Sequence, residues 1–366
     1  MKLKFSFKRI DPIFVITVLA LTVYGLVMVF SASAPSAFYA YNDSLYFFKK
    51  QAIWAVVGIF TMFIMSAIDY KFIKKTASLL YGLSVLMLIA VPIIGTTVNG
   101  AKRWINLGFT TVQPSEFAKI AIIILCTLVL SKIDEMTAKK TWKPILTCCI
   151  ILGIPAILLI RQPHFSAVLI IVLALAFVML VAGVPLRLFT PLGAAGLIGG
   201  GIVALTATYR IERLLSFVDP FKYKMDKGWQ VVQSLYAIGS GGFSGLGLGR
   251  SRQKFLYIPE PQNDFIFSII CEELGFIGAM AVIILFAILF WRAARIALKA
   301  PDRFSMILTF GLISLTIVQV MLNIAVATSS VPPTGIPLPF FSAGGTSFVF
   351  QMIAMGMILN ISTQTK

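Results

Sequence analysis

Residues 165–184 read FSAVLIIVLALAFVMLVAGV, a run without a charged side chain. A helix needs roughly 20 predominantly apolar residues to cross the hydrocarbon core of a bilayer. The whole chain shares this character, because 58% of its 366 residues are apolar and only 12% are charged. Soluble domains are about 45–50% apolar and about 25% charged. The composition therefore excludes a soluble globular protein, and its hydrophobicity excludes a disordered chain.

The long apolar runs predict ten transmembrane helices. These lie near residues 12–33, 47–67, 73–95, 115–131, 144–161, 165–184, 187–208, 265–290, 304–328 and 345–361. A membrane β-barrel is excluded, since its strands would give alternating segments of roughly 10 residues instead of continuous runs. The predicted fold is an all-α polytopic membrane protein with a single domain over residues 1–366.

The short connecting segments predict the orientation. Lysine and arginine gather in the segments that lie inside when both termini are cytoplasmic, which is the usual distribution of positive charge. This N-in, C-in arrangement leaves a large outer loop, about 209–264, between the seventh and eighth helices. Shorter outer segments cover 34–46, 96–114 and 329–344.

The formal net charge of +17 points to lipid chemistry. In a soluble protein such a charge would suggest nucleic acid, but here the cations lie between apolar runs. We therefore expect anionic headgroups or a phosphorylated lipid substrate, and no nucleic-acid partner. The cysteines have no histidine at metal-ligand spacing and are expected to be packing residues. They are Cys126, Cys148, Cys149 and Cys271.

Residues 100–119, GAKRWINLGFTTVQPSEFAK, contain the first polar cluster expected on the outer side. Lys102 and Arg103 have the charge to face a phosphate as paired cations. Ser115 is a candidate cap for the helix that follows, with Glu116 in its first turn. The alternative is an ordinary loop with a well-capped helix.

The large outer loop predicts two short amphipathic helices, at 209–218 and 228–238. Six glycines follow between positions 239 and 249, without the spacing of a P-loop or a dinucleotide-binding motif. Glycine allows close backbone packing or an anion-binding nest, and a structural turn is the simpler interpretation.

Several ionisable residues border the eighth helix. Glu260 and Asp264 precede it, and an acid there either caps the helix or serves as a general base in a partly desolvated site. Glu272 and Glu273 lie inside the apolar run, where we expect structural pairing with an Arg or Lys counter-ion. His164, the single histidine, is interpreted as a packing residue.

The last outer segment, VPPTGIPLPFFSAGGTSF, is rich in proline and glycine. Irregular backbone at membrane depth is tolerated where it is buried in protein or lines a cavity. We expect this segment, with Ser342, to form a wall of an outward-facing cavity.

Four motifs, in this order, resemble the SEDS family (shape, elongation, division and sporulation). They are GAKRWINLG with QPSEFAK (100–119), QSLYAIGSGGFSGLGLGRSRQK (233–254), PEPQNDFIFSIICEELGFIG (259–278) and PTGIPLPFFSAGGTS (333–347). The resemblance covers nearly the whole chain. MVFSASA (28–34) and PTGIPLPF look more like the FtsW/SpoVE branch than RodA.

The resemblance implies a peptidoglycan glycosyltransferase that polymerises lipid II on the outer face of the bacterial cytoplasmic membrane. It also implies a class B penicillin-binding protein and other divisome or elongasome membrane proteins as partners. The family's essential acid, at the start of the DFIF segment, corresponds to Asp264 in this sequence. Asp264 would take the acceptor hydroxyl proton, and inversion at the donor would release undecaprenyl pyrophosphate.

The candidate substrate-binding residues are chosen by their charge and by their expected position on the outer side of the membrane. The cations expected to stabilise the leaving pyrophosphate are Lys102, Arg103, Arg213 and Lys254, with Glu260 as a further substrate contact. Glu116, Glu272, Glu273 and Ser342 are expected to support the site. A divalent cation, Mg or Mn, could assist, although no ligand set in the sequence indicates one.

The chain departs from the family pattern between the fifth and sixth helices. Gln162-Pro163-His164 stands where the family has an acidic turn, and Ala343 replaces the usual tyrosine before Gly-Gly. Two other functions fit a basic polytopic protein: a lipid II flippase, and a non-catalytic scaffold for a penicillin-binding protein. The concentration of polar motifs on the outer side favours the transferase.

Overall fold

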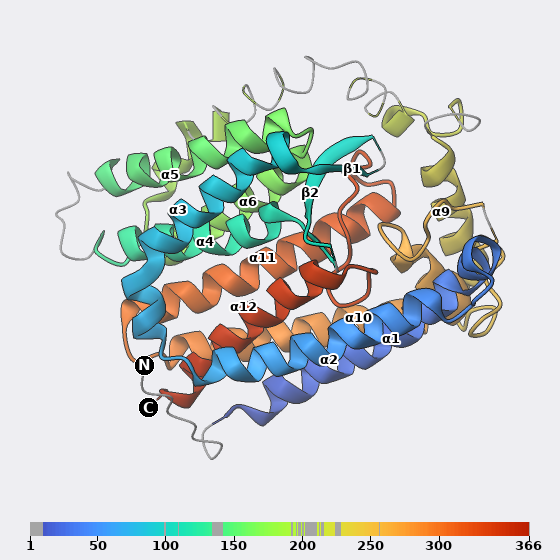
Figure 1. Ribbon diagram of the computed structural model, residues 1–366, viewed down its shortest axis with the longest axis horizontal. Coiled ribbons are helices and arrows are strands. Elements are labelled where there is room, and N and C mark those ends of the chain that lie inside the picture. The colour runs from blue at the N-terminus through green and yellow to red at the C-terminus, as the bar shows by residue number, and fades with distance from the viewer. Residues whose placement is uncertain are drawn as a thin grey trace.

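The structure is a computed structural model, and it is predominantly helical (Figure 1). It describes residues 10–98, 100–108, 110–133, 142–191, 193–194, 196, 199, 201, 211, 213, 216–223, 228–255 and 257–365.

Nine long helices coincide with predicted spans within this described part of the chain. They are α1 (Pro12–Tyr41), α2 (Tyr46–Ala67), α3 (Tyr70–Ile94), α4 (Pro114–Leu130), α5 (Trp142–Arg161), α6 (Phe165–Val181), α10 (Ile266–Leu298), α11 (Arg303–Ala327) and α12 (Gly345–Thr363). Seven of them are long and apolar enough to cross a membrane, and α4 and α6 have 17 residues each. Only part of the predicted span 187–208 lies within the described residues. It begins in a short 3-10 helix, η4 (Leu186–Leu188), and the described residues between 190 and 201 are helical.

Two boundaries differ from the prediction. Helix α1 continues to Tyr41, so that much of the predicted outer segment 34–46 is helical. Helix α10 continues to Leu298, past the predicted end at 290. Both extensions are amphipathic or small-residue stretches, whose weaker apolar signal hides a helix that tertiary packing sustains.

Side-chain caps explain where several helices begin. Asp11 accepts a hydrogen bond from the Phe14 N–H (2.9 Å), and Pro12 occupies the first turn of α1, where no N–H is needed. Asp302 and Ser305 form a reciprocal capping box at α11. Helix α4 differs from the prediction: Pro114 starts it, and the Ser115 hydroxyl makes no hydrogen bond with the described residues.

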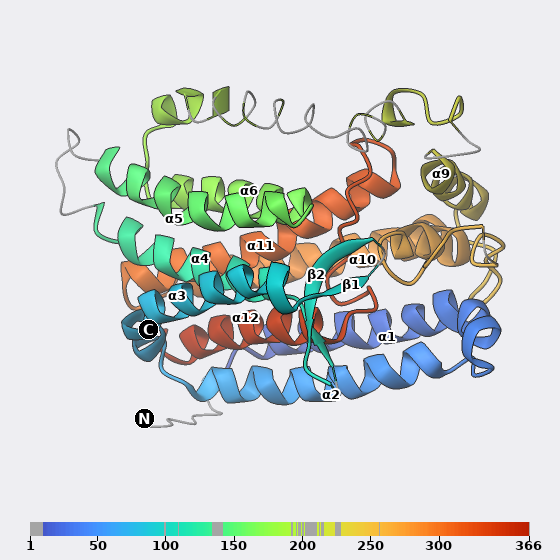
Figure 2. The same ribbon diagram turned by 45° about the horizontal axis from the view of Figure 1, so that its top comes forward.

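The helices form two groups joined by α11 (Figures 1 and 2). One group contains α1, α2, α10 and α12, in which α12 packs most extensively on α2. The other contains α3, α4, α5 and α6, and α11 contacts both groups. This arrangement buries a continuous apolar core that includes Phe14, Phe304 and Phe341.

A small antiparallel sheet lies in the predicted outer segment 96–114. Its strands are β1 (Thr96–Val98), β2 (Ala101–Asn106) and β3 (Thr111–Val112), in the order β1-β2-β3. These strands were not predicted: β1 and β3 have only three and two residues, too few to show an alternating pattern. The sheet fixes the orientation of the two basic residues on β2, Lys102 and Arg103.

Predicted outer segments gather at one end of the bundle, with β1, β2 and α9 (Trp229–Gly241) (Figure 1). Helix α9 confirms the amphipathic helix predicted at 228–238, whereas the one at 209–218 lies partly outside the described residues. The start of α1 and the ends of α10 and α12 meet at the opposite end, where Asp11 N–H contacts the Ser362 hydroxyl. The bundle therefore has two chemically distinct ends.

Candidate active site

Asp264 does not cap the helix that it precedes. Helix α10 begins at Ile266 with Phe265 at the cap position, and no side chain caps its first turn. No hydrogen bond joins the Asp264 carboxylate to a residue in the described part of the chain. Its backbone carbonyl instead accepts a hydrogen bond from Asn323 Nδ2 of α11 (2.7 Å). The capping interpretation is therefore excluded, and the carboxylate is free for another role.

Burial raises the pKa of Asp264 to about 6. The first cause is desolvation, which disfavours the charged form, and the second is the negative charge of Glu260. Arg213 and Arg103 act in the opposite direction and hold the pKa down. The structure thus brings together Glu260 and Asp264, four positions apart in the sequence, with Arg103 and Arg213 from two distant segments.

Both arginines are held by backbone carbonyls of loops around Asp264. Arg103, on β2, donates to the carbonyls of Gln162 (3.2 Å) and Pro163. Arg213 donates to the carbonyl of Pro333 (3.3 Å). These bonds orient the guanidinium groups while leaving each arginine with its positive charge.

The proline-rich segment 331–344 lies against Asp264 at Gly335. A Cβ added to Gly335, whose φ is 64°, would lie 3.2 Å from Asp264 Oδ2. Asn323 Nδ2 also donates to the Ile336 carbonyl (2.7 Å), so this one side-chain amide connects the backbone of Asp264 to the proline-rich segment. Glycine at 335 therefore permits both the left-handed backbone and the close approach to the carboxylate.

Ser342 connects the same segment by hydrogen bonds to the residues just before Asp264. Its hydroxyl donates to the Asn263 carbonyl (2.6 Å) and accepts from the Leu338 N–H (2.7 Å). The Ala343 N–H donates to the Gln262 carbonyl (2.9 Å). Because this last bond uses backbone only, alanine in place of tyrosine at 343 leaves the attachment intact.

Glu260 is exposed and has a positive φ of 48°. Its carboxylate accepts a hydrogen bond from Asn263 Nδ2 (2.9 Å). Its main effect on Asp264 is electrostatic, since its charge raises the pKa of that residue.

Two predicted substrate cations are engaged elsewhere. Lys102 Nζ donates to the carbonyls of Pro92 (2.7 Å) and Ile93 (3.3 Å), at the end of α3. Lys254 forms an ion pair with Glu273 (2.8 Å), and the two side chains are only 4% and 0% exposed. Both lysines were expected to face the pyrophosphate. The charge of Lys254 is instead neutralised by Glu273, and the ammonium of Lys102 points to the end of α3.

Glu272 and Glu273 anchor the loop that leads to Asp264. Glu272 accepts hydrogen bonds from the Arg252 N–H (2.9 Å) and the Gln253 N–H (3.3 Å). Glu273 accepts from the Ser251 N–H (3.3 Å) and the Ser31 hydroxyl as well as from Lys254. The predicted basic counter-ion is present at Glu273, and the pair fixes residues 251–254 on α10.

The glycine-rich segment after α9 packs on α10 backbone to backbone. The Leu246 and Gly247 N–H groups donate to the carbonyls of Glu272 (3.0 Å) and Glu273 (2.9 Å). Helix α10 breaks at Gly275, whose φ is 65°, and the Phe276 N–H bonds to the Gly242 carbonyl instead (3.0 Å). The glycines therefore serve close packing, in agreement with the structural interpretation.

Glu116 lies beside a small polar cavity under the proline-rich segment. It pairs with Lys119 (2.9 Å), whose ammonium also donates to Gln319 Oε1 (3.1 Å). Gln319 Nε2 in turn donates to the Pro337 carbonyl (2.9 Å). Glu116, Gln319 and Ser342 line the cavity, of about 30 Å³. Glu116 thus supports the wall of the site through a polar chain.

His164 carries a neutral imidazole next to this site. Desolvation, followed by the charges of Arg103 and Lys119, lowers its pKa to about 3. Its Nδ1 atom is buried without a hydrogen-bond partner among the described residues. The residue that stands in place of the family's acid therefore adds no charge at neutral pH.

Within the described ranges, no group of three or more His, Cys, Asp or Glu side chains is arranged to hold a metal ion. Asp264 and Glu260 are the carboxylates that interact at the site. Two carboxylates fit a divalent cation only if the substrate's pyrophosphate and water supply its other oxygen ligands.

Sequence reasoning missed Asn323 and Gly335. Asn323 lies inside an apolar run, and a polar residue at such a place is a signal for a functional or connecting role. Gly335 lies between Pro333 and Pro337, and nothing local reveals that its hydrogen faces Asp264.

The chain is similar to known proteins over nearly its whole length. The model of the FtsW/RodA/SpoVE family, described as cell cycle protein, matches residues 12–366. The chain is 41% identical to stage V sporulation protein E of Bacillus subtilis (strain 168), over 97% of this chain and 98% of that one. It is 37% identical to the probable peptidoglycan glycosyltransferase FtsW of Geobacter sp. (strain M18), over 97% of each chain.

Two solved structures are similar over nearly the whole chain. One, from a peptidoglycan synthase complex that coordinates polymerization and crosslinking, has a TM-score of 0.82 and 26% identity, covering 98% of this chain and 99% of that one. Rod shape determining protein RodA of Thermus thermophilus has a TM-score of 0.73 and 24% identity, covering 98% of each chain, and shows the same fold. With a family match over all but its first residues, this chain is a member of the FtsW/RodA/SpoVE family.

Proposed function

We propose that this protein is a peptidoglycan glycosyltransferase that polymerises lipid II into glycan strands at the outer face of the bacterial cytoplasmic membrane. The observation that carries the proposal is Asp264, a desolvated carboxylate with a pKa of about 6 that feels the charges of Arg103 and Arg213. Such a group has the basicity to accept a proton at neutral pH. Relatives that bear the name peptidoglycan glycosyltransferase match the chain over nearly its full length.

In the proposed reaction Asp264 acts as the general base. It takes the proton of the acceptor's sugar 4-hydroxyl as that oxygen attacks the anomeric carbon of the donor. The new glycosidic C–O bond forms while the bond to the pyrophosphate oxygen breaks, and the electron pair leaves with undecaprenyl pyrophosphate. Attack from the face opposite to the leaving group inverts the anomeric centre.

Arg103 and Arg213 are the cations best placed to stabilise the leaving pyrophosphate. Both already act electrostatically on Asp264, and both are oriented by backbone carbonyls. Fixed donors of this kind stabilise charge that develops in the transition state without reorganising. Lys102 and Glu260 are proposed as peripheral substrate contacts. A divalent cation bound with the pyrophosphate remains a further proposal.

The proposal includes a membrane partner. The solved chain most like this one, of those described above, comes from a peptidoglycan synthase complex. We propose a class B penicillin-binding protein as the partner that crosslinks the new strand, in division or in sporulation.

The test is lipid II polymerisation by purified protein, with and without a candidate partner. Asp264→Asn removes the base and nearly keeps the shape, so we expect glycan synthesis to be lost. Asp43→Asn is the matched control, because Asp43 is an exposed acid paired with Lys49 outside the site. Undiminished polymerisation by folded Asp264→Asn protein would contradict the assignment. A wild type that moves lipid II across vesicles but makes no glycan with its cognate partner would favour a flippase.

A further inference from the structure

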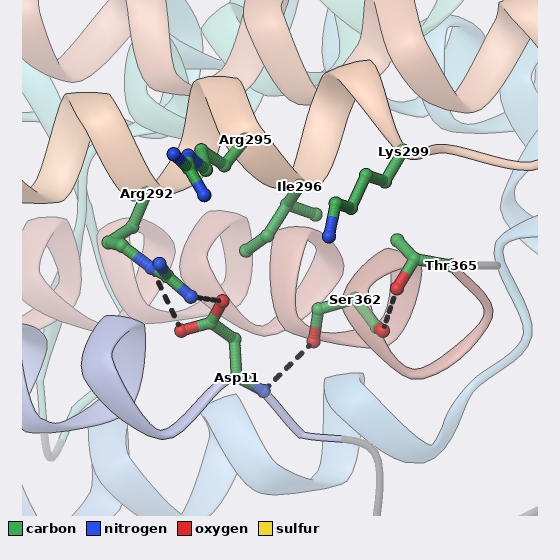
Figure 3. A pocket seen from close by; sticks show the side chains of 7 residues that line it. All are labelled: Asp11, Arg292, Arg295, Ile296, Lys299, Ser362 and Thr365. Carbon is green, nitrogen blue, oxygen red and sulfur yellow. Dashed lines mark hydrogen bonds and ion pairs between the residues drawn. The ribbon is translucent and has the colours of Figure 1, made fainter.

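A basic pocket of about 140 Å³ lies at the end of the bundle opposite to Asp264. This volume is roughly ten times what a single water molecule needs. Figure 3 shows the side chains that line it. Those that the argument uses are Asp11 at the start of α1, Arg292, Arg295 and Lys299 on α10, and Ser362 and Thr365 at the end of α12.

The pocket carries more positive than negative charge among the described residues. Asp11 forms an ion pair with Arg292, which neutralises one of the three cations. Arg295 and Lys299 form no salt bridge within the described part of the chain, and both are exposed. Like charges four residues apart on a helix repel each other. An anion bound between them would remove this repulsion.

The hydroxyl groups of the pocket face the same space. Ser362 and Thr365 donate to backbone carbonyls of α12 (2.7 and 2.9 Å), which leaves their oxygen lone pairs and not their protons toward the pocket. The donors available to a ligand are therefore the ammonium of Lys299 and the guanidinium of Arg295. Two cationic donors on one helix face suit a phosphate group.

The outer surface of α10 indicates that this phosphate belongs to a lipid. Ile277, Ile284, Trp291 and Leu298 recur every seventh position and are exposed at 55%, 51%, 48% and 74%. This stripe is the lipid-facing side of a membrane span, and its tryptophan suits the level of the headgroups. At about 100° per residue, Arg295 and Lys299 lie within about 80° of Trp291 around the helix.

Trp291 also connects the stripe to the pocket. The guanidinium groups of Arg292 and Arg295 lie over its ring, at 5.2 and 5.1 Å from the centroid. A lipid whose acyl chain lies along the stripe would therefore have its headgroup beside these two guanidinium groups.

We propose that this pocket binds the phosphate of an anionic phospholipid headgroup, with Arg295 and Lys299 as its ligands and the α10 stripe as the path of an acyl chain. The site is separate from Asp264 and does not depend on the proposed transferase activity. A soluble phosphate shares the headgroup chemistry but would gain nothing from the stripe.

The test uses the full-length protein, purified and delipidated in an uncharged detergent. Binding of didecanoyl phosphatidylglycerol, didecanoyl phosphatidylcholine and inorganic phosphate is measured by native mass spectrometry and by thermal stabilisation. We expect phosphatidylglycerol to bind the wild type and the other two probes to bind at least tenfold more weakly. Two basic residues near a membrane surface contribute enough for about a thirtyfold loss in the Arg295→Gln/Lys299→Gln variant.

The matched control is Lys71→Gln/Lys75→Gln. These lysines have the same spacing, are exposed, and lie at the start of α3. That start is at the same end of the bundle, because Tyr70 donates to Asp302 at the start of α11. The control should bind phosphatidylglycerol like the wild type.

Three results would overturn the proposal. They are equal loss in both double variants, unchanged binding in Arg295→Gln/Lys299→Gln, and inorganic phosphate binding as tightly as the lipid. If the double variant does not fold, Lys299→Gln alone serves, with an expected loss of about fivefold.

Discussion

The protonation state of Asp264 determines the pH range in which it can accept a proton. With a pKa of about 6, roughly one tenth of the carboxylate is ionised at pH 5 and nearly all of it at pH 8. We expect the polymerisation rate to fall about tenfold between pH 8 and pH 5. The measurement is the initial rate at saturating lipid II, with Asp43→Asn expected to give the same profile. A rate independent of pH over this range would contradict the general-base role.

The same pKa has a consequence for stability. The folded-state pKa is above the usual value of 3.8, so folding favours the protonated carboxyl. This stabilising contribution is complete below pH 3.8 and is lost as pH rises through about 6. At pH 8 we expect Asp264→Asn to raise the free energy of unfolding by up to about 3 kcal/mol, and to have little effect at pH 4. Thermal unfolding at the two pH values measures the difference.

The third prediction at this scale concerns the buried ion pair between Lys254 and Glu273. Glu273→Ala leaves a buried ammonium without its partner and should cost about 3–5 kcal/mol. Replacing both residues, as Lys254→Met with Glu273→Leu, should recover much of this loss, because neither member of the pair is then left as a buried charge without its partner. Thermal unfolding in detergent provides the measurement. The exposed pair Lys49–Asp43 is the control, and Lys49→Ala should leave the melting temperature unchanged.

At the scale of elements, we expect alanine substitutions at two glycines of α9 to have opposite effects on stability. A Cβ on Gly241 would collide with the Cys271 carbonyl of α10, whereas nothing lies within 4 Å of a Cβ on Gly239. Gly241→Ala should therefore separate α9 from α10 and cost about 2 kcal/mol or more. Gly239→Ala should be neutral or stabilise by up to about 1 kcal/mol, because alanine favours the helix.

Both variants are compared by melting temperature and by lipid II polymerisation. Equal effects of the two substitutions would show that the close backbone packing has no energetic importance. Loss of activity with Gly241→Ala alone would indicate that the contact also positions the loop before Asp264.

At the scale of the whole molecule, the prediction concerns orientation. In a background with the four native cysteines replaced by serine or alanine, Asp43→Cys should react with a membrane-impermeant maleimide added to intact cells. Lys71→Cys, at the other end of the bundle, should react only after the membrane is permeabilised. The reverse pattern would overturn the N-in, C-in prediction and place Asp264 in the cytoplasm.

Much of the helical framework could be predicted from the sequence. The run 165–184 reads as a span because it has no charge, and α6 occupies it. The strands at 96–112 could not be predicted in the same way, because β1 and β3 have only three and two residues. Their pairing depends on neighbours that are not encoded locally.

The candidate site was only partly predictable. Asp264 was identified by its motif, but charge alone could not distinguish Arg103 from Lys254. Arg103 acts on Asp264, whereas Lys254 pairs with Glu273. These two basic residues differ in the folded chain because of the partners that packing gives them.

The sequence by itself determined the class of molecule and the places of most helices, and it selected Asp264 as the candidate base. Transfer of apolar side chains into a bilayer depends on local composition, so this information is present in each run. Only the tertiary structure decided which charges surround Asp264, what covers it, and how far its pKa moves. Those properties arise where β2, the loop before α10 and the segment 331–344 meet, and electrostatics and desolvation act across space and not along the chain.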